Sequence, residues 1–344
     1  MSDQFIARAP GKLFVLGEYA VLGGAPAVVA AIDRYIQITL TVNASTTTAH
    51  IVAPDLNSIA VFPAAAPPTV HGPLGFAVAA YAAAVQRFPQ LTDAGTTIEI
   101  ASHLGDRRGT KVGLGSSAAV TVGILAAMFA AARRTASEDQ AFNRNELFAT
   151  ALQAHRSAQN GIGSGADIAA SIYGGLILFE PRAELLPQVT PLTLPASALL
   201  LAAWSGEAAA TVDLVTRYGS ASNGMAARRR AFVDASRACV DDFVRGLAAG
   251  TLPLAAVNAN GAALERLSHE LHVPLLTPRL VDLIAIAHAH GAAAKISGAG
   301  GGDCGIALTD DAAAAQRIRA AWQGAGLTLL DLGISQKGVT VARC

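Results

Sequence analysis

Hydrophobic and polar positions follow two periodicities in the first half of the chain, and each predicts a different element. Residues 12–17 (KLFVLG) and 35–42 (YIQITLTV) are rich in β-branched and aromatic side chains, and 96–102 (TTIEIAS) alternate between apolar and polar, so we expect strands there. Residues 74–88 (LGFAVAAYAAAVQRF) predict a helix that ends before the proline that follows. The intervening residues 53–73 are dense in proline and predict an excursion from regular structure.

The second half of the chain mixes helices and strands in a way typical of α+β layers. Residues 137–159 predict one or two capped helices with Ser137 as an N-cap, and 176–180 (LILFE) predict a strand. Residues 181–197 hold four prolines and predict the crossing into a second domain. Further helices are expected within 160–175, 225–250 and 277–291, and further strands at 197–204, 304–309 and 338–344.

Length and composition fit a soluble protein of two domains. The chain has 344 residues, and we place an N-terminal domain at 1–185 and a C-terminal domain at 186–344. Apolar residues make up 52% and the mean hydropathy is +0.41, much of it from alanine. The longest apolar run, Ala118–Ala132, is shorter than the about 20 residues of a membrane span, which predicts a buried helix. The first ten residues lack the apolar core of a signal peptide, so we expect a cytoplasmic location.

Charge and cysteine content exclude several classes of partner. The 25 basic and 25 acidic residues balance, so the chain has no basic footprint for nucleic acid or an anionic membrane. Cys239, Cys304 and Cys344 show neither zinc spacing nor a disulfide framework, which fits a reduced compartment, and we expect Cys304 to be a small buried thiol. We expect a small-molecule substrate and a monomer or homodimer.

The stretch KVGLGSSAAV, residues 111–120, has the composition of an anion-binding loop. Its glycines, Gly113 and Gly115, allow close backbone approach to a ligand, and Ser116 or Ser117 can cap the helix that follows. Free N–H groups at a helix start then attract a phosphate. An ordinary glycine turn with a serine cap fits the stretch equally well.

Two other phosphate motifs fit less well. The only Gly-Lys pair is Gly11-Lys12, and leucine follows it, so the chain has no Walker A loop. The glycine spacing loosely matches a dinucleotide fingerprint, but the polar loop 103–111 separates it from the preceding predicted strand. A nicotinamide-dependent enzyme is therefore the weaker alternative.

Three separated motifs resemble those of the GHMP kinase family. They are Ala9–Val28 (APGKLFVLGEYAVLGGAPAV), Lys111–Val120, and Lys295–Leu308 (KISGAGGGDCGIAL), and their order and spacing match the family over nearly the whole chain. The resemblance implies a two-domain α+β fold, with an S5-like N-terminal domain, a ferredoxin-like C-terminal domain and the active site in the cleft between them. It also implies ATP and Mg²⁺ as cofactors.

Finer features resemble the phosphomevalonate kinase branch of the family. These are Ala154–Gly175 (AHRSAQNGIGSGADIAASIYGG) and Trp204–Val215 (WSGEAAATVDLV). Mevalonate kinases usually carry a metal-binding glutamate eleven residues before the catalytic aspartate, and here that position is Arg156. The resemblance implies transfer of the γ-phosphoryl group of ATP to 5-phosphomevalonate in isoprenoid biosynthesis. Mevalonate kinase, homoserine kinase, a diphosphomevalonate decarboxylase and a non-catalytic metabolite sensor remain alternatives.

The resemblance assigns the nucleotide and metal sites residue by residue. Ser117 would offer its hydroxyl to Mg²⁺, with Ser116 as the alternative, and Asp167 matches the catalytic aspartate of the family. We expect Asp167 to orient Lys12 or to help hold Mg²⁺. Residues 55–110 are expected to contribute to the adenine pocket. The ATP-binding set is Lys111, Gly113, Leu114, Gly115, Ser116, Ser117, Ala118 and Ala119.

The acceptor determines which charges the site needs. A phosphate monoester has a second pKa of about 6 and is already largely a dianion at neutral pH, so bringing two polyanions together is the harder problem. Cations should therefore dominate, with Lys12, Lys111 and Asp167 as the catalytic residues. His155 is expected to be a packed or solvent-bonded imidazole, and Asp303 to bond backbone groups. The substrate-binding set is Lys12, Glu18, Arg156, Ser164, Ser205, Thr211, Gly298 and Gly300.

Overall fold

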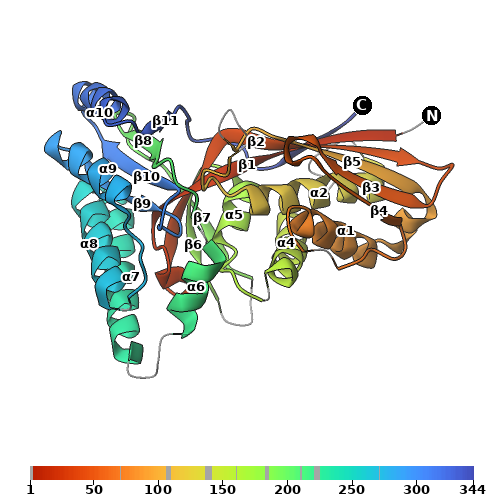
Figure 1. The fold of residues 1–344 in the computed structure, drawn as a ribbon, viewed down its shortest axis with the longest axis horizontal. Coiled ribbons are helices and arrows are strands. Elements are labelled where there is room, and N and C mark those ends of the chain that lie inside the picture. Colours follow the sequence, from red (N-terminus) through yellow and green to blue (C-terminus); the bar gives the residue numbers. More distant parts are fainter. Residues whose placement is uncertain are drawn as a thin grey trace.

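A computed structural model of the chain shows two α+β parts joined side by side (Figure 1). It describes residues 3–69, 71–105, 110–135, 142–159, 161–182, 186–209, 211–220, 225–270 and 272–344, without the side chains of 211, 212 and 220. Each part has its own sheet, and helices cover it, as the predicted two-domain α+β class requires.

The larger sheet has eight strands and carries the N-terminal part. Its order is β12-β1-β2-β5-β3-β4, and β6 pairs with β2 and then with β7. In β2 the residues Ile36, Ile38 and Leu40 are buried and alternate with more exposed polar residues, which makes one face apolar. The strands are β1 (Asp3–Leu16), β2 (Ala27–Asn43), β3 (Thr48–Ala53), β4 (Ser58–Pro63), β5 (Gly95–Ser102), β6 (Leu176–Glu180), β7 (Gln188–Leu192) and β12 (Thr340–Arg343).

Helices pack against one face of this sheet. They are α1 (Gly75–Arg87), α2 (Ser116–Arg133), α4 (Arg144–Ala158) and α5 (Ala166–Tyr173), with short 3₁₀ turns at Ala20–Gly23, Pro54–Leu56 and Pro89–Asp93. Among the described residues α2 is the one helix long and apolar enough to cross a membrane, but 67% of it is buried inside the fold. The expectation of a buried helix over Ala118–Ala132 is confirmed. Helix α4 is capped by Asn143, and the expected cap Ser137 lies outside the described residues.

The smaller sheet carries the C-terminal part. Its order β11-β8-β10-β9 is antiparallel throughout and corresponds to strands 4-1-3-2 of a ferredoxin-like βαββαβ unit. Trp322 is fully buried beneath it and donates its indole N–H to the carbonyl of Leu283 at 2.9 Å. The strands are β8 (Leu199–Trp204), β9 (Ala293–Ser297), β10 (Cys304–Thr309) and β11 (Thr328–Leu330), and the helices are α6 (Thr211–Ser220), α7 (Ala226–Ala248), α8 (Leu254–Glu270), α9 (Pro278–Ala289) and α10 (Ala312–Gly324).

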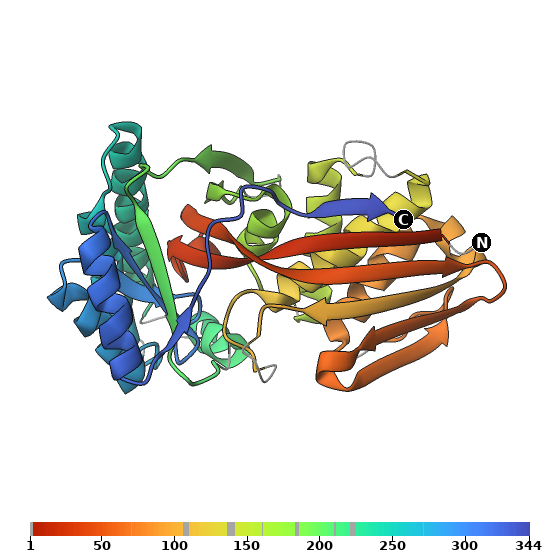
Figure 2. The same cartoon turned by 90° about the horizontal axis from the view of Figure 1, so that it is seen from above.

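The chain crosses between the two parts more than once. Strand β7 lies within the proline-rich segment 181–197 and still pairs with β6 of the larger sheet. At the other end of the sequence, β12 returns to pair antiparallel with β1, so the two chain ends lie close together (Figure 2). Both parts are therefore tied together by backbone hydrogen bonds as well as by side chains.

Candidate active site

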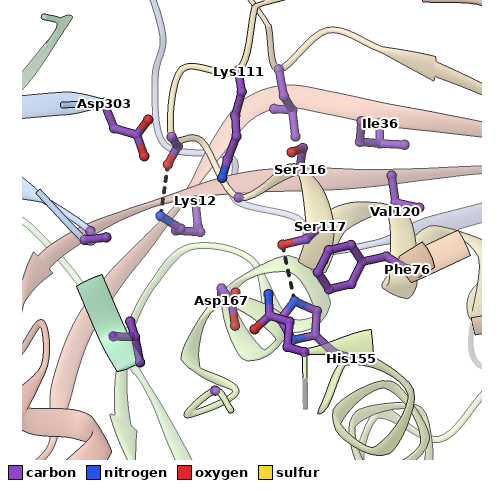
Figure 3. A pocket seen from close by; sticks show the side chains of 18 of the residues that line it. Lys12, Ile36, Phe76, Lys111, Ser116, Ser117, Val120, His155, Asp167 and Asp303 are labelled. Carbon is purple, nitrogen blue, oxygen red and sulfur yellow. Dashed lines mark hydrogen bonds between the residues drawn. The ribbon is translucent and has the colours of Figure 1, made fainter. Parts of the chain in front are cut away.

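A cavity of about 820 Å³ collects most of the residues that the motifs single out. The first motif enters from β1, the glycine loop from the start of α2, and the third motif from the loop between β9 and β10 (Figure 3). The predicted site residues that line the cavity are Lys12, Glu18, Lys111, Gly113, Gly115, Ser116, Ser117, Ser164, Asp167 and Gly298.

The glycine loop opens α2 without a side-chain cap. Gly113 and Gly115 have φ angles of +84° and +82°, which favour glycine, and the N-cap of α2 is Gly115 itself. The expectation of a serine cap is therefore wrong: Ser116 and Ser117 are the first two residues of the helix, and within the described chain no side-chain hydrogen bond caps it. Uncapped N–H groups at the positive end of a helix form an anion site.

Lys12 is held against this loop. Its backbone N–H donates to the carbonyl of Leu114 at 2.8 Å, and its Nζ donates to the carbonyl of Gly113 at 3.0 Å. A Cβ on Gly115 would lie 2.8 Å from the Cγ of Lys12, so glycine is needed for this approach. Lys111, two residues before Gly113, is exposed and also lines the cavity. Two lysine side chains thus line the same cavity as the start of α2.

Asp167 lies in the first turn of α5 and lines the cavity. Its Oδ1 accepts the backbone N–H of Ile168 at 3.0 Å. Within the described residues Asp167 makes no ion pair with Lys12, whose ammonium is directed to Gly113. Asp167 therefore keeps carboxylate lone pairs available to the cavity.

His155 is buried beside the start of α2. Its Nε2 lies 3.2 Å from the hydroxyl oxygen of Ser117, and its ring stacks at 4.9 Å from the ring of Phe76. The neighbouring Arg156 lies outside the cavity lining, and its Nε and Nη2 donate to the carbonyl of Gly163 at 3.2 and 3.1 Å. Of the two expected environments for His155, the structure shows the packed one, and Arg156 holds the loop that leads to α5.

Two other predicted substrate residues, Ser205 and Gly300, lie outside the cavity lining of the described chain. Ser205 is buried in a turn with Glu207, and Gly300 packs so closely on Leu275 that a Cβ would lie 2.5 Å from its carbonyl oxygen. The backbone of Thr211 begins α6, but its side chain lies outside what the structure describes. Their substrate roles stay predictions.

Glu18 has a partner that the sequence does not reveal. It forms an ion pair with Lys295 of β9, and the two side chains are 1% and 0% exposed. Burial lowers the pKa of Lys295, and the carboxylate of Glu18 partly offsets this effect. The second oxygen of Glu18 is buried without a hydrogen-bond partner in the described chain. The hydroxyl of the adjacent Tyr19 donates to the carbonyl of Ala299, so the first and third motifs meet here.

The third motif also supports the glycine loop. Asp303 has a φ of +54°, and its Oδ1 accepts the N–H of Ala209 at 3.0 Å, which confirms that it bonds backbone groups. The Cys304 thiol donates to the carbonyl of Val112 at 2.6 Å, and burial raises its pKa, as expected for an unreactive thiol. The bond from Cys304 connects the C-terminal part to the chain just before Gly113.

One end of the cavity is apolar. Its lining comes from several elements of the N-terminal part, and the side chains are Ile36, Leu56, Phe76, Ile100, Leu104 and Val120. Part of this set falls within the segment 55–110, for which the sequence offered no individual residue. Ile36 and Val120 lie outside that segment, and their place in the cavity became clear only from the fold.

The donor set can hold a magnesium ion only together with a ligand. Within the described residues no group of three or more histidine, cysteine, aspartate or glutamate side chains forms a metal site. Mg²⁺ is commonly bound by one or two carboxylates together with substrate phosphates and waters. The carboxylate of Asp167 and the hydroxyl of Ser117, facing one cavity with a phosphate loop, fit that pattern.

Comparisons with known proteins agree with this arrangement. Residues 76–175 match the GHMP kinases N terminal domain and 244–326 match the model GHMP kinases C terminal. A phosphomevalonate kinase of Streptomyces sp. strain CL190 is 34% identical, covering 97% of this chain and 98% of its own. A mevalonate kinase of Methanothermobacter thermautotrophicus is 30% identical, over 51% of this chain and 50% of its own.

The fold agrees as well. The structure of Streptococcus pneumoniae phosphomevalonate kinase in complex with phosphomevalonate and AMPPNP matches with a TM-score of 0.77, at 22% identity and over 97% of this chain and 99% of that one. Two domain matches and a relative aligned over nearly the full length leave one conclusion. The chain belongs to the GHMP kinase family.

Proposed function

We propose that this ATP-dependent kinase is a phosphomevalonate kinase, which transfers the γ-phosphoryl group of ATP to 5-phosphomevalonate and gives 5-diphosphomevalonate. The observation that carries the proposal is the meeting of Lys12, Lys111, Ser117 and Asp167 from separate segments in one cavity. The acceptor is taken from the Streptomyces relative, which aligns over 97% of this chain. A cytoplasmic location and a monomeric or dimeric state are part of the same proposal.

The nucleotide phosphates would bind at the start of α2. Residues 113–119 would offer N–H groups, and the apolar end of the cavity, with Phe76 and Ile100, would receive the adenine. Bound Mg²⁺ would neutralise phosphate charge, and Ser117 and Asp167 are the side chains that would hold it.

The two lysines would supply most of the charge stabilisation that the reaction needs. The acceptor phosphate is already ionised near neutral pH, so no side chain has to remove a proton from it. Lys12 and Lys111 would screen the repulsion between the acceptor and the nucleotide, and a fixed ammonium at a developing charge stabilises the transition state. Because the ammonium of Lys12 is bonded to the carbonyl of Gly113, it would be fixed in position between the acceptor phosphate and the nucleotide phosphates.

A panel of acceptors tests the proposal. ADP release is measured with ATP and Mg²⁺ on phosphomevalonate, mevalonate, homoserine and galactose, and CO₂ release on diphosphomevalonate. We expect kcat/KM for phosphomevalonate to exceed every other acceptor by at least about 100-fold. Turnover of another acceptor alone would reassign the substrate, and CO₂ release would reassign the reaction. No turnover of any acceptor would support a metabolite sensor.

Mevalonate kinase is the second candidate. The Methanothermobacter relative favours it, although it aligns over only half of this chain. Arg156 occupies the position where mevalonate kinases usually carry a metal-binding glutamate, and it is bonded to Gly163. The same panel separates the two acceptors directly.

A further inference from the structure

One buried side chain of the site has no part in the function proposed above. His155 on α4 is 3% exposed, and its Nε2 lies 3.2 Å from the Oγ of Ser117. Its ring is stacked on Phe76 with the two planes 32° apart, so the imidazole is held in one orientation. Figure 3 shows the ring reaching from α4 to the first turn of α2, on the same wall as Asp167.

We propose that His155 is a positioning residue that accepts the hydroxyl proton of Ser117 and so turns the lone pairs of that oxygen toward the metal-bound phosphates. A serine hydroxyl has one proton and two lone pairs. A metal ligand must donate a lone pair, so its proton has to point elsewhere. A neutral imidazole with its proton on Nδ1 offers Nε2 as the acceptor. The inference rests on the proposed role of Ser117 toward Mg²⁺.

The same contact distinguishes the two serines of the loop. Among the described residues the hydroxyl of Ser116 has no hydrogen-bond partner, whereas that of Ser117 has His155. The carbonyl of Ser117 is also bonded, by the hydroxyl of Thr121 at 2.9 Å, which fixes its backbone. A hydroxyl whose proton is held loses no rotational freedom when it binds a cation. Ser117 is therefore prepared as a ligand, and Ser116 is not.

Three substitutions test the direction of the bond. In His155→Gln the amide oxygen stands as many bonds from Cα as Nε2 does, so it can accept the proton. In His155→Asn the oxygen corresponds to Nδ1, and His155→Leu has no acceptor. We measure binding of AMPPNP by calorimetry, with Mg²⁺ and then with EDTA. The ratio of the Kd of AMPPNP in EDTA to its Kd in Mg²⁺ should be unchanged in His155→Gln. In the other two variants this ratio should fall by about 10–100-fold, the range for partners that orient metal ligands.

Two controls separate positioning from packing. His288 also places Nε2 near a side-chain oxygen, that of Asn258 at 3.0 Å, but on α9 of the C-terminal part. His288→Leu makes the same chemical change and should leave the effect of Mg²⁺ unchanged. In a Ser117→Ala background, His155→Leu should cause no further loss. Nitrogen NMR of the free protein gives an independent reading and should show the proton on Nδ1 of His155.

Each outcome decides something. A proton on Nε2, or equal weakening with Mg²⁺ and with EDTA in His155→Asn, would overturn the inference. If Ser117→Ala abolishes the effect of Mg²⁺ and the His155 variants do not, the His155 inference fails while the proposed function stands. If Ser117→Ala leaves the effect intact, the proposed metal role of Ser117 fails first. Should His155→Leu not fold, the comparison of His155→Gln with His155→Asn still decides.

Discussion

The buried pair of Glu18 and Lys295 allows a stability prediction with a definite size. Lys295→Met removes the ammonium and leaves the Glu18 carboxylate, which is 1% exposed and whose second oxygen has no hydrogen-bond partner among the described residues. It also removes a bond from Lys295 Nζ to the carbonyl of Ile296 at 2.7 Å. Because both side chains are almost fully desolvated, water does not screen the interaction between their charges.

Breaking a buried pair on one side costs about 3–5 kcal/mol, because a buried charge loses its compensation. That is a large share of the about 5–15 kcal/mol that stabilises a typical fold. The double variant Glu18→Gln/Lys295→Met removes both charges and should recover most of the loss. The two single costs should therefore add to clearly more than the cost of the double variant.

The assay is urea unfolding followed by circular dichroism, on wild type, both single variants and the double variant. An exposed pair gives the matched control: Arg245 and Asp242 on α7 are 75% and 62% exposed at 2.8 Å. Arg245→Met should change the unfolding free energy by less than about 1 kcal/mol. If Lys295→Met lowers the unfolding free energy no more than Arg245→Met does, Glu18 and Lys295 do not form the stabilising buried ion pair that their geometry indicates.

Three further predictions address other parts of the chain. Gly113→Ala should lower kcat/KM for ATP about tenfold or more, because a Cβ would lie 2.6 Å from Asp303 and the φ of +84° costs about 1–2 kcal/mol, whereas Gly219→Ala should have little effect. The backbone N–H groups that Asp311 caps lower its pKa from the ordinary value of 3.8. The carboxylate therefore stabilises the fold above that value, and this stabilisation is lost as the pH falls through the folded pKa. Scanning calorimetry should show the difference in Tm between wild type and Asp311→Ala narrowing below about pH 4. Alkylation of the native protein followed by mass spectrometry should label the exposed Cys344 and spare the buried thiols.

Local pattern was enough to predict most of the elements that carry the motifs. The helix expected at 74–88 is α1, and the strands expected at 96–102 and 304–309 are β5 and β10. Alternation of apolar and polar residues and the positions of prolines are local patterns, so they can be recognised within a single sequence. The helices α8 and α10 were not predicted, because which of their side chains are buried depends on the packing of the fold.

Pairings between distant residues could not be predicted in the same way. Lys295 follows its partner Glu18 by 277 positions, and no periodicity links them. The return of β12 to β1 depends on where the chain end lies in space, which the sequence of 338–344 does not encode. The serine cap was a local inference, and it failed because Gly115, at positive φ, occupies the cap position itself.

The end of α4 shows how such distant pairings build the site. Two consecutive residues there point to different loops: His155 to Ser117 at the start of α2, and Arg156 to the carbonyl of Gly163 ahead of α5. Helices are stiff, so this turn fixes the separation between the phosphate loop and the segment that carries Asp167. A guanidinium that grips a carbonyl through two N–H groups holds it in one direction, which a lysine would not do. Arg156 can therefore serve phosphoryl transfer without touching the acceptor, by keeping Asp167 at its distance from the helix that would bind the nucleotide.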